Sequence, residues 1–200
     1  MTFGARYVAR MIADFAARYP DVRMEVDFED RPVDPVGEGY DVVIRIGALS
    51  DSALIARKIA DCPIFQVACP DFVARYGEPS APEDLRDYPA IVFTQHQANA
   101  EWQYRHSDGE RGRVRYQKSF GANNADMMIE ACRQGLGIAE LPIFAVAAEL
   151  ERRELMRVLP DYETDPLRGI YAVYPPNRYV SARVRLFVES LVDFGRTLPW

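Results

Sequence analysis

The chain has 200 residues, enough for one large domain or two small ones. Its 24 Lys and Arg and 30 Asp and Glu give a net charge of −6. This charge argues against a chain that itself binds a polyanion, because phosphate binding depends on clustered basic side chains. The composition, 48% hydrophobic and 27% charged, is globular, and no apolar run approaches the roughly 18–20 residues that span a bilayer. The first residues lack the apolar stretch of a signal peptide, so we expect a cytoplasmic protein without a membrane partner.

The first fifty residues predict a helix and two strands. Apolar residues at three- and four-residue spacing indicate an amphipathic helix over 5–19, which Pro20 ends. Residues 22–29 alternate apolar and charged side chains, a pattern typical of a half-buried strand with an acidic outer face. The β-branched run 41–47 predicts a buried parallel strand that ends at a glycine.

The middle of the chain predicts further strands and one short helix. A strand at 64–69 precedes a helix through 72–76, and the proline-rich stretch 77–90 is expected to be a loop with one helical turn at 82–86. Two strands are expected at 90–94 and 112–120, with a polar turn at 107–109 between them.

The last third alternates helices and strands. Asn123 is expected to cap a helix over 124–134, which Gly135 ends. The elements expected after it are a strand at 137–141, a helix at 143–152, a strand at 155–159, a strand at 170–174 and a helix at 180–196. This alternation predicts an α/β protein with mostly parallel sheets.

No catalytic motif stands out. Gly135-Leu136-Gly137 resembles part of a dinucleotide loop, but it follows a predicted helix, so a helix end is the better interpretation. His96 and His106 have no metal-ligand spacing with the cysteines, and the three scattered cysteines favour neither disulfides nor a zinc site. We therefore predict no enzyme, no metal and no cofactor.

Several motifs in a fixed order carry a family resemblance. They are YPDV at 19–22, YDVVIRIG at 40–47, LIARKIAD at 54–61, CPDFVARYGEPSAPEDL at 69–85, ANNADMM at 122–128, GLGIAELP at 135–142 and AVYPPNRYVSARVRLFVESL at 172–191. Each motif is weak alone, but the ordered series resembles the effector-binding domain of LysR-type transcriptional regulators almost from end to end.

The resemblance implies the periplasmic-binding-protein type II fold, with two α/β subdomains joined by two crossing strands. Subdomain I would comprise residues 1–67 and 175–200, and subdomain II residues 69–173. A small-molecule effector would bind in the cleft between the two subdomains, in line with the rule that α/β sheets bind ligands beyond the carboxyl ends of their strands.

The resemblance also assigns candidate ligand-binding residues. Those of subdomain I are Thr2 and Phe3 in a loop before the first helix, Asp30 and Arg31 after the alternating strand, and Ile46 and Gly47 at the next strand end. The others are Cys69 at the hinge, Thr94 and Gln95 at a strand end, Asn123 and Asn124 at a helix start, and Leu141 and Pro142 in a turn. A carboxylate would fit the N-terminus of the first helix.

Each polar candidate also has a structural interpretation. Asn123 could serve only as a helix cap, and Arg31 could be a solvated loop arginine. Glu140 departs from the family pattern, which has an apolar residue there, so it either shapes an unusual pocket or turns outward.

The resemblance implies two segments that these residues do not contain. A winged helix-turn-helix would contact DNA, and a first strand would precede the TFG loop. Either the chain begins late or another strand fills that place. We expect the sensing half of a regulator, which forms a homodimer or higher homo-oligomer through helices 5–19 and 124–134. The alternatives are a stand-alone solute-binding protein and, more remotely, a small α/β enzyme.

Overall fold

A computed structural model describes residues 1–49, 53–94, 101–176 and 181–200. Its contacts divide the chain into two units: unit 1 holds Met1, Phe3–Cys62 and Arg168–Trp200, and unit 2 holds Thr2 and Pro63–Leu167. The boundaries between the units lie at 62/63 and 167/168, whereas the predicted boundaries are 67–69 and 173–175. The reason is strand pairing, because residues 64–68 hydrogen-bond to strands of unit 2 and residues 169–174 to strands of unit 1.

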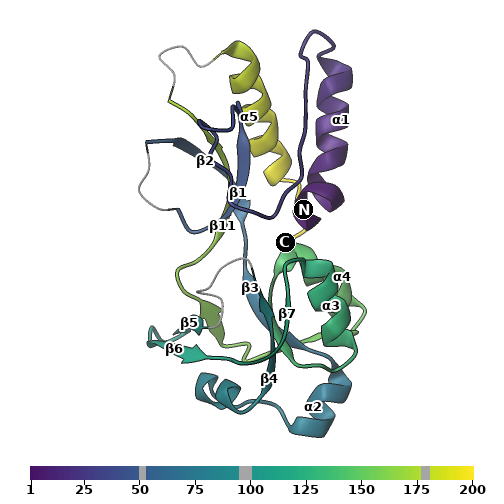
Figure 1. Cartoon of the computed structure of the whole chain (residues 1–200), viewed down its shortest axis with the longest axis vertical. Coiled ribbons are helices and arrows are strands. Elements are labelled where there is room, and N and C mark those ends of the chain that lie inside the picture. The colour runs from purple at the N-terminus through teal and green to yellow at the C-terminus, as the bar shows by residue number, and fades with distance from the viewer. Residues whose placement is uncertain (50–52, 95–100, 177–180) are drawn as a thin grey trace. The chain divides into compact units, whose positions relative to one another are not determined.

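Unit 1 contains a three-stranded antiparallel sheet. Strand β11 (Gly169–Tyr174), from near the end of the chain, lies between β1 (Val43–Gly47) and β2 (Ile55–Asp61) (Figure 1). The prediction that 41–47 forms a buried parallel strand is therefore wrong. β1 pairs antiparallel with β11 alone and stays half-exposed, because a sheet edge has one neighbour only.

Two helical segments complete unit 1. Residues from Thr2 onward are helical, with a π-helical turn η1 (Gly4–Val8) that continues into α1 (Ala9–Arg18), so Thr2 and Phe3 do not lie in a loop as predicted. Helix α5 (Ala182–Gly195) packs against β2 and against α1, where the Phe15 and Phe187 rings meet at 5.1 Å (Figure 1). The apolar stripes expected on both helices thus form the core of this unit.

The strand predicted at residues 22–29 is absent. This segment is extended, but it pairs with none of the described strands, and a strand exists only where a neighbour supplies ladder hydrogen bonds. Val26 and Phe28 consequently remain 44% and 41% exposed. The alternating pattern of residues 22–29 is typical of a half-buried strand, but the pattern does not show whether a neighbouring strand is present to pair with it.

Unit 2 is built on a five-stranded mixed sheet in the order β7-β4-β8-β3-β9. The strands are β3 (Ile64–Ala68), β4 (Pro89–Phe93), β7 (Gln117–Ala122), β8 (Ile138–Pro142) and β9 (Met156–Val158). β4 runs parallel to β7 and β8, whereas β3 runs antiparallel to β8 and β9. The expectation of mostly parallel sheets is wrong for both units.

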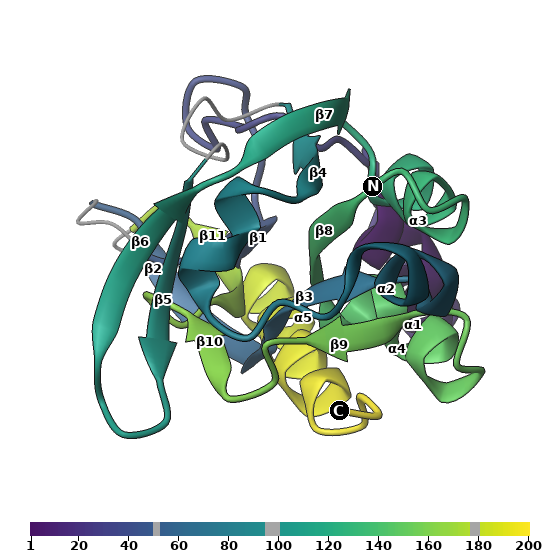
Figure 2. The same ribbon diagram turned by 90° about the horizontal axis from the view of Figure 1, so that it is seen from below.

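The two faces of this sheet carry different elements. Helices α3 (Ala125–Arg133) and α4 (Ile143–Glu151) lie on one side, while a small antiparallel sheet lies on the other (Figure 2). The small sheet consists of β5 (Glu101–His106), β6 (Arg111–Arg115) and β10 (Tyr162–Thr164). The sequence pattern does not predict β5 and β10, and it predicts one strand at 112–120 where the structure has β6 and β7.

The connecting segments largely follow the sequence pattern. Helix α2 (Pro70–Tyr76) follows β3, and a 3-10 turn η2 (Pro82–Arg86) stands where one helical turn was predicted. Gly135 ends α3 at a φ of +71°, which confirms the helix-end interpretation of the glycine pair. None of the helices in the described ranges is long and apolar enough to cross a membrane.

Candidate functional site

Four of the predicted site residues come together at one edge of the five-stranded sheet. Because β4, β7 and β8 run parallel, their carboxyl ends meet at the same edge. Thr94 follows β4, Asn123 and Asn124 follow β7, and Pro142 ends β8. We call these four residues the carboxyl edge.

Two side chains of the carboxyl edge, those of Thr94 and Asn123, are exposed. The Thr94 backbone N–H donates to the Ala122 carbonyl at 2.8 Å, which joins the ends of β4 and β7. Thr94 and Asn123 are both exposed, and their side chains make no hydrogen bond to the described part of the chain. A hydroxyl and an amide therefore follow the ends of two neighbouring strands, and both groups can hydrogen-bond to a ligand.

Asn124, not Asn123, caps the following helix. Its Oδ1 accepts from the backbone N–H groups of Asp126 and Met127 at 2.9 and 3.1 Å, so α3 begins one residue later than predicted. The cap satisfies two N–H groups that a helix start leaves unpaired. Asn124 is thus engaged structurally, whereas Asn123 is not.

Both covering helices start at this edge. α3 begins after Asn124 and α4 after Pro142, where the Ile143 N–H donates to the Pro63 carbonyl at 2.9 Å. The positive ends of two helix dipoles therefore lie at the carboxyl edge and favour a negative group there. Leu141, also predicted as a site residue, is 1% exposed and belongs to the core.

Two candidates of unit 1, Arg31 and Asp30, are paired with neighbouring charged groups. Arg31 forms ion pairs with Glu29 and with Glu38, in line with a structural loop arginine. The hydrogen bonds and charges of both carboxylates raise the pKa of Arg31, and Arg31 with the Asp34 N–H lowers the pKa of Glu38 to about 2. Asp30 pairs with the terminal amine of Met1.

The remaining candidates lie in different surroundings. Phe3 is buried and stacks on Tyr7, whereas Ile46 is 37% exposed and Gly47 is the last residue of β1, opposite Gly169. Thr2 groups with unit 2 by its contacts and donates its hydroxyl to Asp126 Oδ2 at 3.1 Å.

Two further candidates do not join the carboxyl edge. Cys69 is not at the hinge: it precedes α2, seven residues inside unit 2 and at the opposite end of β3 from Pro63, and it is buried. Gln95 lies outside the described residues, as does His96.

Two of the three cysteines are buried thiols of low reactivity. Burial raises the pKa of the Cys62 and Cys132 thiols to about 12, so both stay protonated and weakly nucleophilic near neutral pH. Within the ranges that the structure describes, no group of three His, Cys, Asp or Glu side chains is placed to hold a metal ion.

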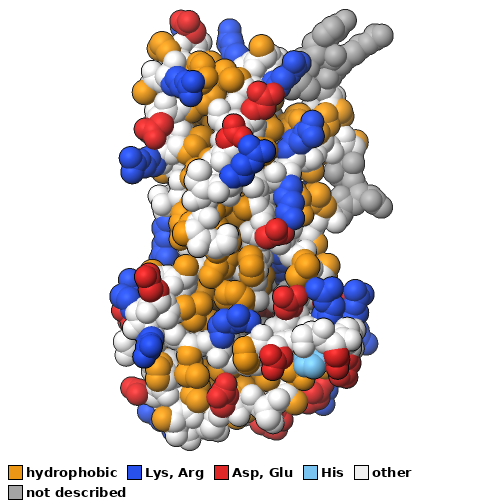
Figure 3. All heavy atoms as spheres, turned by 180° about the vertical axis from the view of Figure 1, so that it is seen from behind, with side chains coloured by type: hydrophobic (Ala, Val, Ile, Leu, Met, Phe, Trp, Pro, Cys, Tyr) orange, Lys and Arg blue, Asp and Glu red, His pale blue; other side chains and the backbone are white. Residues whose placement is uncertain are grey.

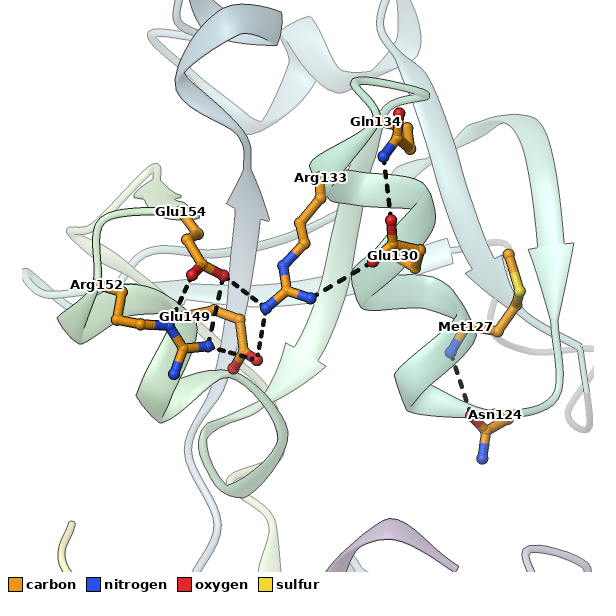
Figure 4. A network of polar contacts seen from close by, with 8 residues as sticks. All are labelled: Asn124, Met127, Glu130, Arg133, Gln134, Glu149, Arg152 and Glu154. Atoms are coloured by element: carbon orange, nitrogen blue, oxygen red, sulfur yellow. Dashed lines mark hydrogen bonds and ion pairs between the residues drawn. The ribbon is translucent and has the colours of Figure 1, made fainter.

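An ion-pair network ties α3 to α4 on the helical side of the sheet (Figure 4). Arg133 contacts Glu130, Glu149 and Glu154, and Arg152 contacts the last two. Burial opposes the charged guanidinium, but hydrogen bonds and attraction from these carboxylates outweigh it and raise the pKa of Arg133. The network fixes the ends of both helices whose starts lie at the carboxyl edge.

The basic strand β6 does not form an anion-binding patch. Arg113 and Arg115 face Glu101, and Arg111 faces Asp165. Figure 3 shows basic and acidic side chains interspersed over the face that it presents.

Sequence reasoning missed one polar group of unit 2. Gln66 is 3% exposed in the middle of β3, and its Nε2 donates to the Tyr116 hydroxyl at 2.7 Å. Across the strands it faces Glu140, which is half-buried and accepts from the Thr164 hydroxyl at 3.0 Å. The sequence signal that could have indicated this buried polar group is the single glutamine in the apolar run IFQVA.

Comparisons with known proteins agree on one family. Residues 1–196 match the model of the LysR substrate binding domain. The HTH-type transcriptional regulator PtxR of Pseudomonas aeruginosa is 35% identical over 185 residues, covering 92% of this chain and 59% of PtxR. The HTH-type transcriptional activator AaeR of Escherichia coli is 30% identical over 193 residues, covering 96% of this chain and 62% of AaeR.

A solved structure agrees with the sequence relatives. The regulatory domain of AphB from Vibrio vulnificus superposes with a TM-score of 0.78 at 29% identity and covers 96% of this chain and 94% of that one. This likeness confirms the expected fold class. The relatives are regulators, which favours that interpretation over a stand-alone solute-binding protein. The chain spans about three fifths of the length of the curated relatives it matches, and it belongs to the LysR family of transcriptional regulators as their substrate-binding domain.

Proposed function

We propose that this domain binds a small-molecule effector at the carboxyl edge, and that binding changes DNA binding or transcription by a longer cytoplasmic regulator with an N-terminal DNA-binding domain. The observation that carries the proposal is the pair of exposed polar side chains of Thr94 and Asn123, which make no hydrogen bond to the described part of the chain. In this proposal the domain is a sensor and not an enzyme, and DNA is reached only through the other domain.

A small carboxylate is the effector class that fits this edge. The starts of α3 and α4 favour negative charge, and a hydroxyl and an amide can donate to carboxylate oxygens. The Asn124 cap and the Pro63 carbonyl already occupy three of the helical N–H groups, so recognition would depend on the side chains more than on free backbone donors.

Thermal unfolding with a panel of small aliphatic and aromatic carboxylates, at constant ionic strength, tests the proposal. Binding to the folded state alone should raise stability by about 2.7 kcal/mol at a hundredfold excess of ligand over Kd. Thr94→Val and Asn123→Ala should weaken the response, whereas Gln103→Ala, on the exposed face of the small sheet, should not. A panel without any shift, or variants that respond like the wild type, would contradict the proposal.

We also propose that the domain forms a homodimer or higher homo-oligomer through α1 of one copy and α3 of another. Helix α1 fully buries only Phe15, while Met11 and Ile12 stay half-buried, and Met127 on α3 is 45% exposed. Sedimentation should show a dimer that Met127→Asp weakens. A monomer at every accessible concentration would contradict this part.

A further inference from the structure

Strand β7 brings a lysine to the carboxyl edge. Lys118 is the second residue of the strand, and its side chain extends toward the far end of the strand, where Gly121 is the last residue but one. A methyl group added at Gly121 would lie 2.8 Å from Lys118 Cε, 3.0 Å from Lys118 Nζ and 2.7 Å from Thr94 Cγ2. The ammonium group of Lys118 and the side chain of Thr94 therefore lie close together, beside the same glycine.

The local backbone of β7 explains this placement. The register with β4 shifts here, because Ala90 pairs with Lys118 and the next residue of β4 pairs with Phe120. Ser119 is the extra residue, and its hydroxyl donates to the Ala90 carbonyl at 3.1 Å. Such a bulge changes the side on which the following side chains lie, so Lys118 and Gly121 meet although they are three positions apart. The φ of Gly121 is not positive, and glycine serves here to leave space for the lysine.

The positive charge of Lys118 is not compensated within the part of the chain that the structure describes. Lys118 is exposed, and it forms no ion pair or hydrogen bond with the described residues. The only other lysine of the sequence, Lys58, pairs with Asp61 in unit 1. Arg115, three residues before Lys118, faces Glu101. The ammonium group beside Thr94 is therefore available to an anion from solution.

We propose that Lys118 determines the preference of the carboxyl edge for a negatively charged effector. Its ammonium group forms an ion pair with the effector carboxylate, and the Thr94 hydroxyl donates to the same carboxylate. A lysine suits this role because its charge is compact and its flexible stem carries three donors. The inference rests on the effector binding proposed above and adds the source of its charge preference. The competing interpretation is a lysine that only covers Gly121 with its stem while its charge stays in water.

The two lysines provide a direct measurement on the wild-type chain. With carbon-13-labelled lysine, the Cε–Hε region of an NMR spectrum contains signals of Lys58 and Lys118 alone, and Lys58→Arg assigns them. In a titration with sodium butyrate at constant ionic strength, the Lys118 signal should shift and saturate, while the Lys58 signal stays in place. Butyramide, the neutral analogue, should not shift the Lys118 signal. A Lys118 signal that butyrate leaves unmoved would overturn the inference.

Three variants locate the charge preference, with binding of butyrate and butyramide measured by thermal unfolding. Lys118→Met keeps an apolar stem but removes the charge, and it should weaken butyrate binding about tenfold and abolish the preference for butyrate over butyramide. Gly121→Ala keeps the charge but occupies the place of Lys118 Cε and Nζ, so it should reduce the same preference. The atoms that its methyl group meets belong to the ends of side chains that can move, so this variant should fold. Arg115→Met removes an equal charge nearby and should leave binding unchanged.

The variants also separate this inference from the function on which it rests. If Asn123→Ala weakens butyrate binding and Lys118→Met does not, Lys118 has no part in recognition, and the inference is overturned while the proposed function remains. If Lys118→Met weakens butyrate binding but Thr94→Val and Asn123→Ala do not, the role of Lys118 is supported and the binding site proposed for the effector is contradicted. If Lys118→Met fails to fold, the wild-type titration and Gly121→Ala still decide.

Discussion

Arg31 in unit 1 and Arg133 in unit 2 each reach several carboxylates, but the acids around them differ in exposure. The side chains of Glu29 and Glu38 beside Arg31 are 41% and 32% exposed, whereas that of Glu149 beside Arg133 is 6% exposed. Water screens the ion pairs of Arg31, whereas in the second group only Glu149 is shielded from it, because Glu130 and Glu154 beside Arg133 are 52% and 38% exposed. The same pattern of charges therefore fixes a loop in unit 1 and supports a helix pair in unit 2.

Arg133→Met should have the largest effect on stability. It leaves the buried Glu149 carboxylate with only the longer contact to Arg152, at 3.4 Å. Loss of a charged hydrogen bond to a buried group costs about 2–3 kcal/mol in the free energy of unfolding. Urea denaturation followed by circular dichroism should show this as a lower midpoint with an unchanged slope.

Arg31→Met is the matched control, because it also removes an arginine from a group of carboxylates. Exposed ion pairs contribute little to stability because water and salt screen them, so its midpoint should move little. Similar losses in both variants would show that burial of Glu149 is not what distinguishes the two networks.

The neighbouring residues Asn123 and Asn124 of the carboxyl edge differ in the same way, because one side chain is exposed and the other has hydrogen-bond partners, and the expected effects on stability are smaller. Asn124→Ala removes the cap of α3 and should cost about 1 kcal/mol. Asn123→Ala removes an exposed side chain and should change stability by less than about 0.5 kcal/mol. The same urea experiment measures both, and the order for effector binding should be the reverse, with Asn123→Ala the more damaging. Equal stability losses would contradict the assignment of the cap.

The fold could be predicted from sequence where one element carries a strong pattern of its own. The helices at 125–133 and 182–195 and the strand at 64–68 lie within a few residues of their expected positions. Strand direction could not be predicted, because β11 reaches its place between β1 and β2 from the far end of the chain. The segment 22–29 has a strand pattern but lacks a neighbour, and pairing is a property of two segments.

The candidate site shows the same limit. The position of Thr94 at a strand end could be predicted, with its candidate role implied by the family resemblance. The partners of a side chain could not: Arg31 is engaged by Glu38, seven residues further along a loop, and Gln66 by Tyr116, fifty residues away. Which polar groups remain available to a ligand depends on such contacts, and these form only when the chain has folded.

The smallest effect concerns the titration of Glu38. Hydrogen bonds from Arg31 and from the Asp34 N–H lower its pKa to about 2, from 4.5 in the absence of these partners. Because the folded pKa is the lower one, the contribution of this pair to stability is complete above about pH 4.5 and is lost as the pH falls from there toward 2. Carboxyl-carbon NMR of Glu38 between pH 6 and 2 measures the midpoint.

Arg31→Met separates the two causes of this shift. The backbone donor at Asp34 remains in the variant, so the pKa of Glu38 should rise only part of the way toward 4.5. High salt should act in the same direction on the wild type, because the pair is exposed and screened by solvent ions. A Glu38 pKa that stays near 2 in Arg31→Met would assign the shift to the loop backbone. The ion pair between Arg31 and Glu38 would then be weak, and the comparison with Arg133 would no longer hold. Arg31 would again be a candidate to bind a ligand in unit 1.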